Sequence, residues 1–83
     1  MPLQDHLKEL IAIGASVTAN CLGCLEFHVA KAREYGADDL EIKEAIRVGR
    51  LVRKGAADKS DKFAHALLKR ERPASKTSCG ECA

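Results

Sequence analysis

The sequence predicts an all-α protein, a small helical bundle that assembles as an oligomer. Apolar residues recur every three or four positions in three separate segments, which is the spacing of one helix face. Residues that begin or end helices fall between these segments, including Asn20, Gly36 and Asp38. The chain has only 83 residues and would bury roughly 60–65% of its unfolded surface, so we expect burial between copies.

The first helix is predicted over residues 3–17. Its apolar face comprises Leu3, Leu7, Leu10, Ile11, Gly14 and Ala15. Pro2 suits the first turn of a helix, where a missing N–H costs nothing. Glu9 lies beside the apolar face, so this carboxylate is either a rim residue or the partner of a polar group inside.

The second helix is predicted from about Cys21 to Tyr35. A break precedes it at residues 18–20, where Thr18 and Asn20 could each cap the helix. Gly36 is well placed to end it in the left-handed conformation.

The third helix is predicted to begin after a cap at Asp38 and Asp39. It is either one long helix from residue 39 to about 69 or a helix broken near residues 55–60. Gly49 and the small residues 55–57 would allow another helix to approach closely.

Two regions are expected: a helical domain over residues 1–70 and a flexible tail over residues 71–83. The tail has no periodicity and ends with a second cysteine pair, Cys79 and Cys82. A flexible tail of this length reaches about 15–20 Å, so these thiols could visit the first pair.

The charge pattern argues against nucleic-acid and membrane partners. The net charge is only +2, and the one basic segment is typical of a solvated helix face: Arg47, Arg50, Arg53 and Lys54. No secretory signal is visible, and the apolar run over residues 10–17 is too short to span a bilayer, so a cytoplasmic location is expected. His6 and His65 are interpreted as ordinary surface or core residues.

The candidate site is Cys21, Cys24 and His28. In a helix these residues would share one face, with the thiols in the first turn. There the macrodipole favours a thiolate, and an imidazole can accept a thiol proton. Three interpretations of Cys21 and Cys24 are open: a buried structural pair, a zinc or iron site completed by Cys79 and Cys82, or a redox dithiol. The position at a helix start favours the dithiol.

With Glu9 included, the pattern Glu-x11-Cys-x2-Cys-x3-His resembles alkylhydroperoxidase D-like members of the carboxymuconolactone decarboxylase superfamily. Residues 30–37 and 41–46 are similar to the flanking helices of that family. The resemblance covers about residues 5–68. It implies an all-α fold, present here as a single minimal repeat, and a homo-oligomer, commonly a trimer or hexamer.

The resemblance also implies thiol-dependent reduction of hydroperoxides or disulfides, as in antioxidant defence. Cys24 would lie next to His28, Glu9 would complete a proton relay to that imidazole, and Cys21 would be the disulfide partner of Cys24. The helix-start argument instead favours Cys21 as the more exposed attacking thiol, so the order of attack stays open. Leu22 and Gly23 stand where the family often has a polar residue.

The sequence therefore predicts a peroxidase or disulfide reductase whose catalytic residues are Cys21, Cys24, His28 and Glu9. No bound cofactor or metal is expected. An external thiol reductant, either a protein or a small dithiol, would reduce the pair, and Cys79 and Cys82 would be a secondary redox pair that hands over the electrons. A four-cysteine metal module and a non-catalytic oligomeric scaffold are the alternatives.

Overall fold

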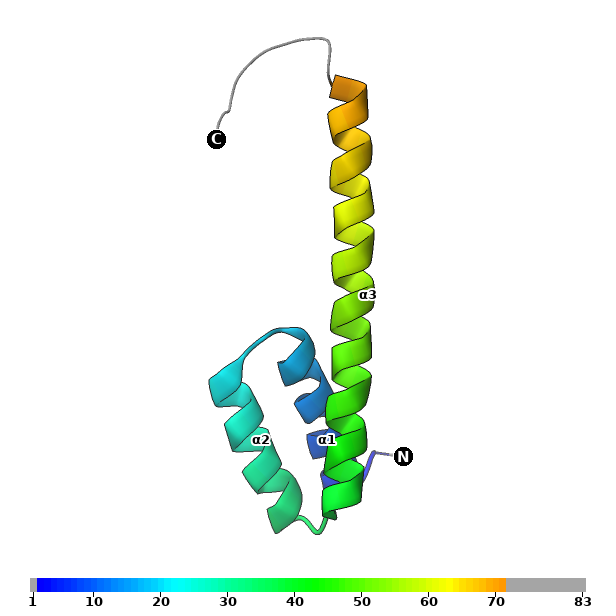
Figure 1. Ribbon diagram of the computed structural model, residues 1–83. Helices are drawn as coiled ribbons and strands as arrows, with labels where there is room; N and C mark the ends of the chain where they lie inside the picture. Colours follow the sequence, from blue (N-terminus) through cyan, green and yellow to red (C-terminus); the bar gives the residue numbers. More distant parts are fainter. Residues whose placement is uncertain (1, 72–83) are drawn as a thin grey trace.

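The computed structural model describes residues 2–71, which form three helices and no strand (Figure 1). These are α1 (Asp5–Thr18), α2 (Leu22–Glu34) and α3 (Asp39–Glu71). The predicted all-α fold is confirmed. The predicted tail, with Cys79 and Cys82, lies outside the described residues except for its first residue, Glu71, which ends α3.

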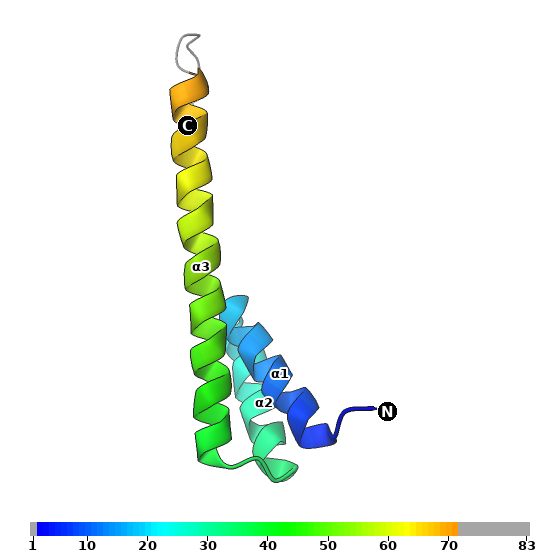
Figure 2. The same ribbon diagram turned by 90° about the vertical axis from the view of Figure 1, so that its right-hand side faces the viewer.

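Helix α1 is the centre of the fold. It packs against both α2 and the first half of α3, whereas α2 and α3 scarcely contact one another (Figure 2). The core is small and aliphatic, as predicted. Its buried members are Ile13, Ala32, Ala37 and Ile42, surrounded by the partly buried Leu10, Leu25, Val29, Ala45 and Ile46.

Helix α1 begins two residues later than predicted. The carbonyl of Gln4 accepts the N–H groups of Leu7 and Lys8, so the helical hydrogen-bond ladder starts there. Pro2 therefore precedes the helix rather than lying in its first turn. Asp5 occupies that turn, where its negative charge complements the helix dipole.

Helix α2 ends in a Schellman motif built on Gly36, as the sequence indicated. Gly36 has a φ of 97°, which a residue with a side chain rarely adopts. Its N–H donates to the carbonyl of Arg33 at 3.0 Å, and the N–H of Ala37 donates to the carbonyl of Ala32 at 2.9 Å. Because Ala32 and Ala37 are both buried, the turn also closes one end of the core.

Helix α3 begins with a capping box between Asp38 and Glu41. The N–H of Glu41 donates to Oδ1 of Asp38 at 2.8 Å, and the N–H of Asp38 donates to Oε1 of Glu41 at 3.0 Å. Of the two predicted alternatives, the structure has the single long helix, of 33 residues. Gly55 lies within it, because glycine lowers helix propensity by only about 1 kcal/mol and keeps its N–H.

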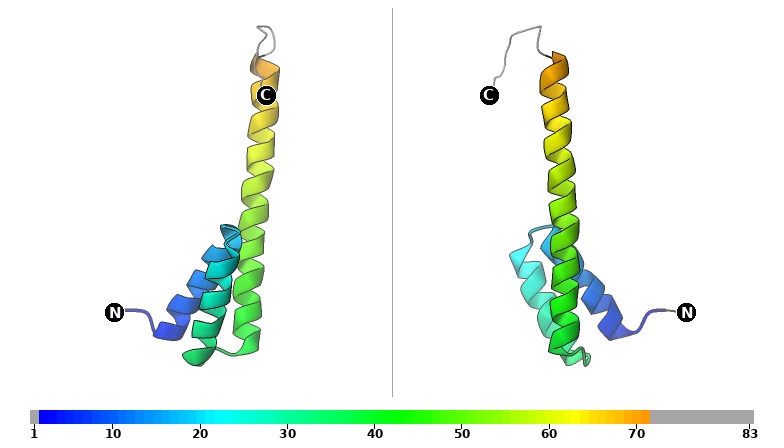
Figure 3. Two further views of the ribbon diagram at one scale, coloured as in Figure 1. Left: turned by 90° about the vertical axis from the view of Figure 1, so that its left-hand side faces the viewer. Right: turned by 45° about the vertical axis from the view of Figure 1, so that its right-hand side comes forward.

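The second half of α3 extends beyond α1 and α2 (Figure 3). The radius of gyration is 19.0 Å, against about 11 Å for a compact domain of this length. Several large apolar side chains on α3 are exposed, namely Leu51, Val52, Phe63 and Leu68. One copy therefore leaves much of its apolar surface in water.

Helices α1 and α3 cross at two glycines, Gly14 and Gly49. A Cβ on Gly49 would lie 2.5 Å from the carbonyl oxygen of Gly14 and 2.9 Å from Cβ of Val17. Thr18 closes the crossing, because its hydroxyl oxygen lies 2.9 Å from the carbonyl oxygen of Gly14 and 3.1 Å from that of Gly49. The predicted close approach at Gly49 is confirmed, whereas a Cβ on Gly55 would have no atom of another element within 4 Å in the part of the chain that the structure describes.

We expect Gly49→Ala to lower the free energy of unfolding by about 1–3 kcal/mol, because the new methyl group meets backbone that cannot move aside cheaply. Urea denaturation followed by circular dichroism measures the change.

Gly55→Ala is the matched control on the same helix. It should raise stability by up to about 1 kcal/mol, because it improves helix propensity and its methyl group meets nothing. Equal gains from both substitutions would contradict the close crossing.

Candidate functional site

Cys21 lies in the turn that joins α1 to α2. This turn is itself a Schellman motif, in which the N–H of Asn20 donates to the carbonyl of Val17 and that of Cys21 to the carbonyl of Ser16. Asn20 has a φ of 57°, a conformation that asparagine tolerates better than most residues. The end of α1 thus fixes the backbone of the first cysteine.

Cys21 also caps the start of α2. Its φ and ψ are extended, and its Sγ accepts the N–H of Cys24 at 3.2 Å. The expectation that Thr18 or Asn20 would cap this helix was wrong, because Asn20 ends α1 and the hydroxyl of Thr18 turns back to Gly14 and Gly49. The predicted single helical face also shortens to Cys24 and His28, since Cys21 precedes the first helical residue.

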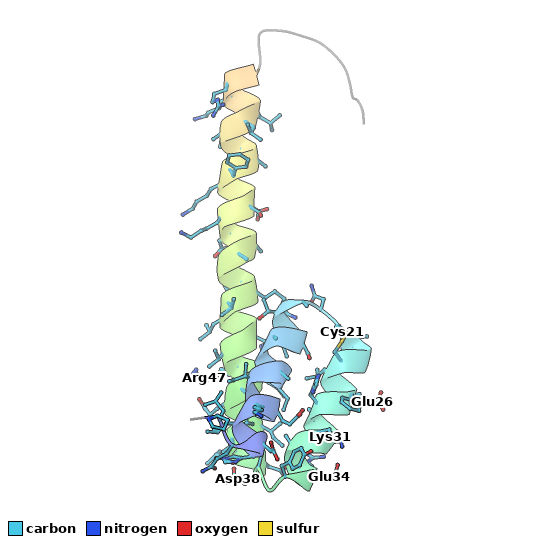
Figure 4. All side chains as sticks on the ribbon, turned by 180° about the vertical axis from the view of Figure 1, so that it is seen from behind. Cys21, Glu26, Lys31, Glu34, Asp38 and Arg47 are labelled. Atoms are coloured by element: carbon cyan, nitrogen blue, oxygen red, sulfur yellow. A yellow bond between two sulfur atoms is a disulfide. The ribbon has the colours of Figure 1, made fainter. Side chains whose placement is uncertain are left out.

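Cys21 and Cys24 form a disulfide at the start of α2, with their Cα atoms 5.3 Å apart (Figure 4). Cys24 is exposed, whereas Cys21 is of intermediate exposure. This order is the reverse of the one expected from the helix-start argument. The backbone of Cys21 is held against the end of α1 by the bond from its N–H to the carbonyl of Ser16, whereas Cys24 lies within the first turn of α2.

Glu9 on α1 and His28 on α2 form a close pair. Oε1 of Glu9 lies 2.6 Å from Nδ1 of His28, and the two side chains are 19% and 29% exposed. This pair spans 19 positions of sequence and joins the two helices beside the disulfide. Glu9 is therefore the partner of a polar group, one of the two alternatives left open by the sequence.

The Glu9 contact occupies Nδ1 of the imidazole and leaves Nε2 available. Among residues 2–71, no hydrogen bond joins His28 to either sulfur, and the sulfurs of a disulfide carry no proton to donate. Cys24 and His28 are one helical turn apart, so they are neighbours on the surface of α2. A carboxylate, an imidazole and a dithiol in this order are suited to proton transfer coupled to thiol chemistry.

Comparison with protein-family models gives a match to the Carboxymuconolactone decarboxylase family over residues 2–67. The chain belongs to this family.

One relative of the chain is "Uncharacterized protein 4 in cox locus" of Paracoccus denitrificans, which is 41% identical to it over 64 residues. The match covers 77% of the chain and 53% of the relative, so the chain spans about half the length of that protein. No solved structure matches. The family includes enzymes, and the three helices of the chain are consistent with its all-α fold.

Arg53 supports the site, and the sequence alone did not reveal this role. Its Nη1 donates to the carbonyl of Val17 at 3.1 Å and to Oδ1 of Asn20 at 2.9 Å. One guanidinium group on α3 thus ties down the turn that carries Cys21. The sequence indicated only that Arg53 belonged to a basic helix segment.

The other histidines and cysteines considered in the sequence are His6, His65, Cys79 and Cys82. Within residues 2–71, no cluster of three or more His, Cys, Asp or Glu side chains could hold a metal ion. Cys79 and Cys82, which the four-cysteine metal alternative requires, lie outside that range. His6 is of intermediate exposure and His65 is exposed. None of the helices described in residues 2–71 has the length and apolar character needed to cross a membrane.

We expect Arg53→Met to lower the free energy of unfolding by about 1–2 kcal/mol, because it removes two hydrogen bonds from the turn while keeping an unbranched side chain. Thermal and urea unfolding of the oxidised protein measure this change.

Arg50→Met provides the control, since it removes the same charge one turn earlier on α3. A surface substitution of this kind should change stability by less than about 0.5 kcal/mol. If Arg53→Met is equally harmless, the guanidinium group does not hold the turn.

Proposed function

We propose that this member of the carboxymuconolactone decarboxylase family is a dithiol oxidoreductase that reduces hydroperoxides or disulfides. The observation that carries the proposal is the Cys21–Cys24 disulfide at the start of α2, one turn before a histidine that is paired with Glu9. A cysteine pair with a purely structural role would require neither the exposed position of Cys24 nor a carboxylate–imidazole pair nearby.

In the proposed reaction, His28 accepts the proton of the Cys24 thiol, and Glu9 stabilises the resulting imidazolium. The thiolate attacks a peroxide oxygen, which breaks the O–O bond, leaves a sulfenic acid and releases an alcohol once the alkoxide is protonated. Cys21 then attacks the sulfenic sulfur, and water leaves as the disulfide forms.

A disulfide substrate would follow the same course through a mixed disulfide on Cys24, with two thiols released. An external dithiol then returns the pair to the reduced state.

We assign the first attack to Cys24, because it is the more exposed cysteine and the one on the helical face of His28. Cys21 suits the role of the second thiol. When the disulfide opens at Cys24, the departing sulfur of Cys21 is already an acceptor of the Cys24 N–H, and hydrogen bonding favours a thiolate. The helix dipole acts in the same direction.

Two alternatives compete with this proposal, a four-cysteine metal module and a non-catalytic oligomeric scaffold whose thiols would be unreactive. A four-cysteine metal module would bind zinc or iron stoichiometrically, whereas the dithiol protein would be active without metal.

The proposed cycle also requires a thiol reductant, either a protein or a small dithiol, which fits the reducing cytoplasm. Cys79 and Cys82 could pass electrons to the first pair.

The experiment uses reduced, metal-free protein and its Cys21→Ser and Cys24→Ser variants. One equivalent of a hydroperoxide or a small disulfide should oxidise the wild type to the Cys21–Cys24 disulfide. With the small disulfide, Cys21→Ser should accumulate a mixed disulfide on Cys24, whereas Cys24→Ser should form its adduct far more slowly. Mass mapping of the modified peptides measures each product.

Glu9→Gln tests the proton relay in the same assay. It should slow oxidation of the wild-type pair by about 10²-fold near neutral pH, because general acid–base catalysis contributes on that scale. Glu26→Gln, an exposed change on α2, is the matched control. Thiols that stay reduced with both oxidants would remove the oxidoreductase proposal, and faster adduct formation at Cys21 would reverse the order of attack.

We also propose that the active form is a homo-oligomer, a trimer or hexamer. An open apolar groove of about 540 Å³ runs between α1 and the start of α3, lined by Leu10, Ile11, Leu40, Ala45 and Val48 among others. Acidic side chains of Asp38, Glu41 and Glu44 also line it. The projecting part of α3 offers exposed Phe63 and Leu68 beside several lysines, which complements such a groove on a second copy.

We expect sedimentation equilibrium at micromolar concentration to give the mass of a trimer or hexamer. Phe63→Glu should lower that mass, because the carboxylate would be buried at the contact. Lys43→Glu, an exposed change at the start of α3, should leave it unchanged. A monomeric wild type would contradict this proposal.

A further inference from the structure

A cleft lies beside the turn that carries the disulfide. It has a volume of about 650 Å³ and runs from Asn20 along α3. Four of its lining side chains are cationic, those of Arg47, Arg50, Arg53 and Lys54, and none is a carboxylate. We call it the basic cleft. Its size is within the range of sites that bind small molecules.

The positive charge of the basic cleft is not neutralised within the described chain. Residues 47–54 contain four cations and no acid. Among residues 2–71, whose side chains are described up to residue 70, the ion pairs include neither Arg47 nor Arg50. Lys54 has one exposed partner, Asp58, at 3.3 Å. Like charges three or four positions apart destabilise a helix, so this arrangement has a cost that an anionic ligand would offset.

The cleft and the disulfide are connected through the chain itself. Asn20 lines the cleft and directly precedes Cys21, and its side chain accepts a hydrogen bond from Arg53. Arg47 lies on α3 on the side away from Cys21 (Figure 4), so the cleft runs from the turn around the surface of the helix. A small molecule whose anionic end lay at the Asn20 end of the cleft, where Arg53 contacts Asn20, could therefore present its other end to Cys21.

We propose that the basic cleft binds the carboxylate of a small anionic disulfide, which the Cys21–Cys24 dithiol reduces. This inference rests on the proposed function and names the substrate class of the same site. Guanidinium groups match a carboxylate through paired hydrogen bonds, and disulfides of thiol acids carry such a group a few bonds from the sulfur.

The reaction balances as a two-electron reduction. The Cys24 thiolate attacks one sulfur of the substrate, so that a Cys24–substrate bond forms and the substrate's own S–S bond breaks. The departing thiolate takes up the proton that left Cys24. Cys21 then attacks Sγ of Cys24, closes the protein disulfide and releases the second thiol with the proton that Cys21 loses.

The test compares disulfides that differ in charge. Reduced protein is mixed with dithiodipropionate, which is anionic, with its neutral diamide, or with cationic cystamine, and the loss of protein thiols gives each rate. Each rate is divided by the rate of dithiothreitol with the same disulfide, which corrects for the intrinsic reactivity of the leaving thiol. We expect the wild type to prefer the anion over the diamide by about tenfold or more, with cystamine slowest.

The double variant Arg50→Gln/Lys54→Gln should reduce this preference to within about twofold, as should high salt, because both weaken the attraction of charges. Lys43→Gln/Lys59→Gln is the matched control. It removes two positive charges of α3 outside the cleft and should retain the wild-type preference. A general loss of folding would slow all three disulfides equally and leave their ratio unchanged.

The outcomes separate this inference from the proposed function. Equal rates with the anion and the diamide would overturn the basic cleft as a substrate site while the dithiol function stands. A preference that persists in the Arg50→Gln/Lys54→Gln variant would overturn it too. If no disulfide and no hydroperoxide oxidises the cysteine pair, the proposed function and this inference both fail.

Discussion

The close crossing of α1 and α3 at Gly14 and Gly49 is the constraint on which the site depends. The backbones approach there because neither residue carries a side chain. Just beyond the crossing, the hydroxyl of Thr18 reaches the carbonyl of Gly49, and the guanidinium group of Arg53 reaches the turn after α1. A wider spacing would break both contacts, so helix packing fixes the position of the cysteine pair.

Cys21 links this packing to chemistry because it belongs to the ends of two helices at once. Its N–H completes the turn that ends α1, and its sulfur accepts the N–H of Cys24 in the first turn of α2. When a disulfide opens at Cys24, the sulfur that departs is thus already in a position that stabilises negative charge. In the proposed function, the same cysteine pair would support the structure when oxidised and supply the reactive thiols when reduced.

Local signals in the sequence were enough to predict the three helices, and distant contacts were not. Gly36 and Asp38 act within a few residues of their own positions, so their roles as the end of α2 and the cap of α3 could be inferred. The cap at Cys21 was missed because Asn20 suits either the start or the end of a helix. Arg53 contacts Val17 and Asn20, which precede it by 36 and 33 positions, and no local sequence pattern indicates such contacts.

The Glu9–His28 pair shows why the proposed assembly matters for catalysis. Both side chains are partly exposed in one copy, so water can reach the groups that would move the proton. Electrostatic and proton-transfer effects strengthen when water is excluded, because the local dielectric falls. The exposed apolar residues of α3 show that one copy does not bury its own surface. Association that covers this surface and shields the pair would therefore stabilise the fold and improve the site together.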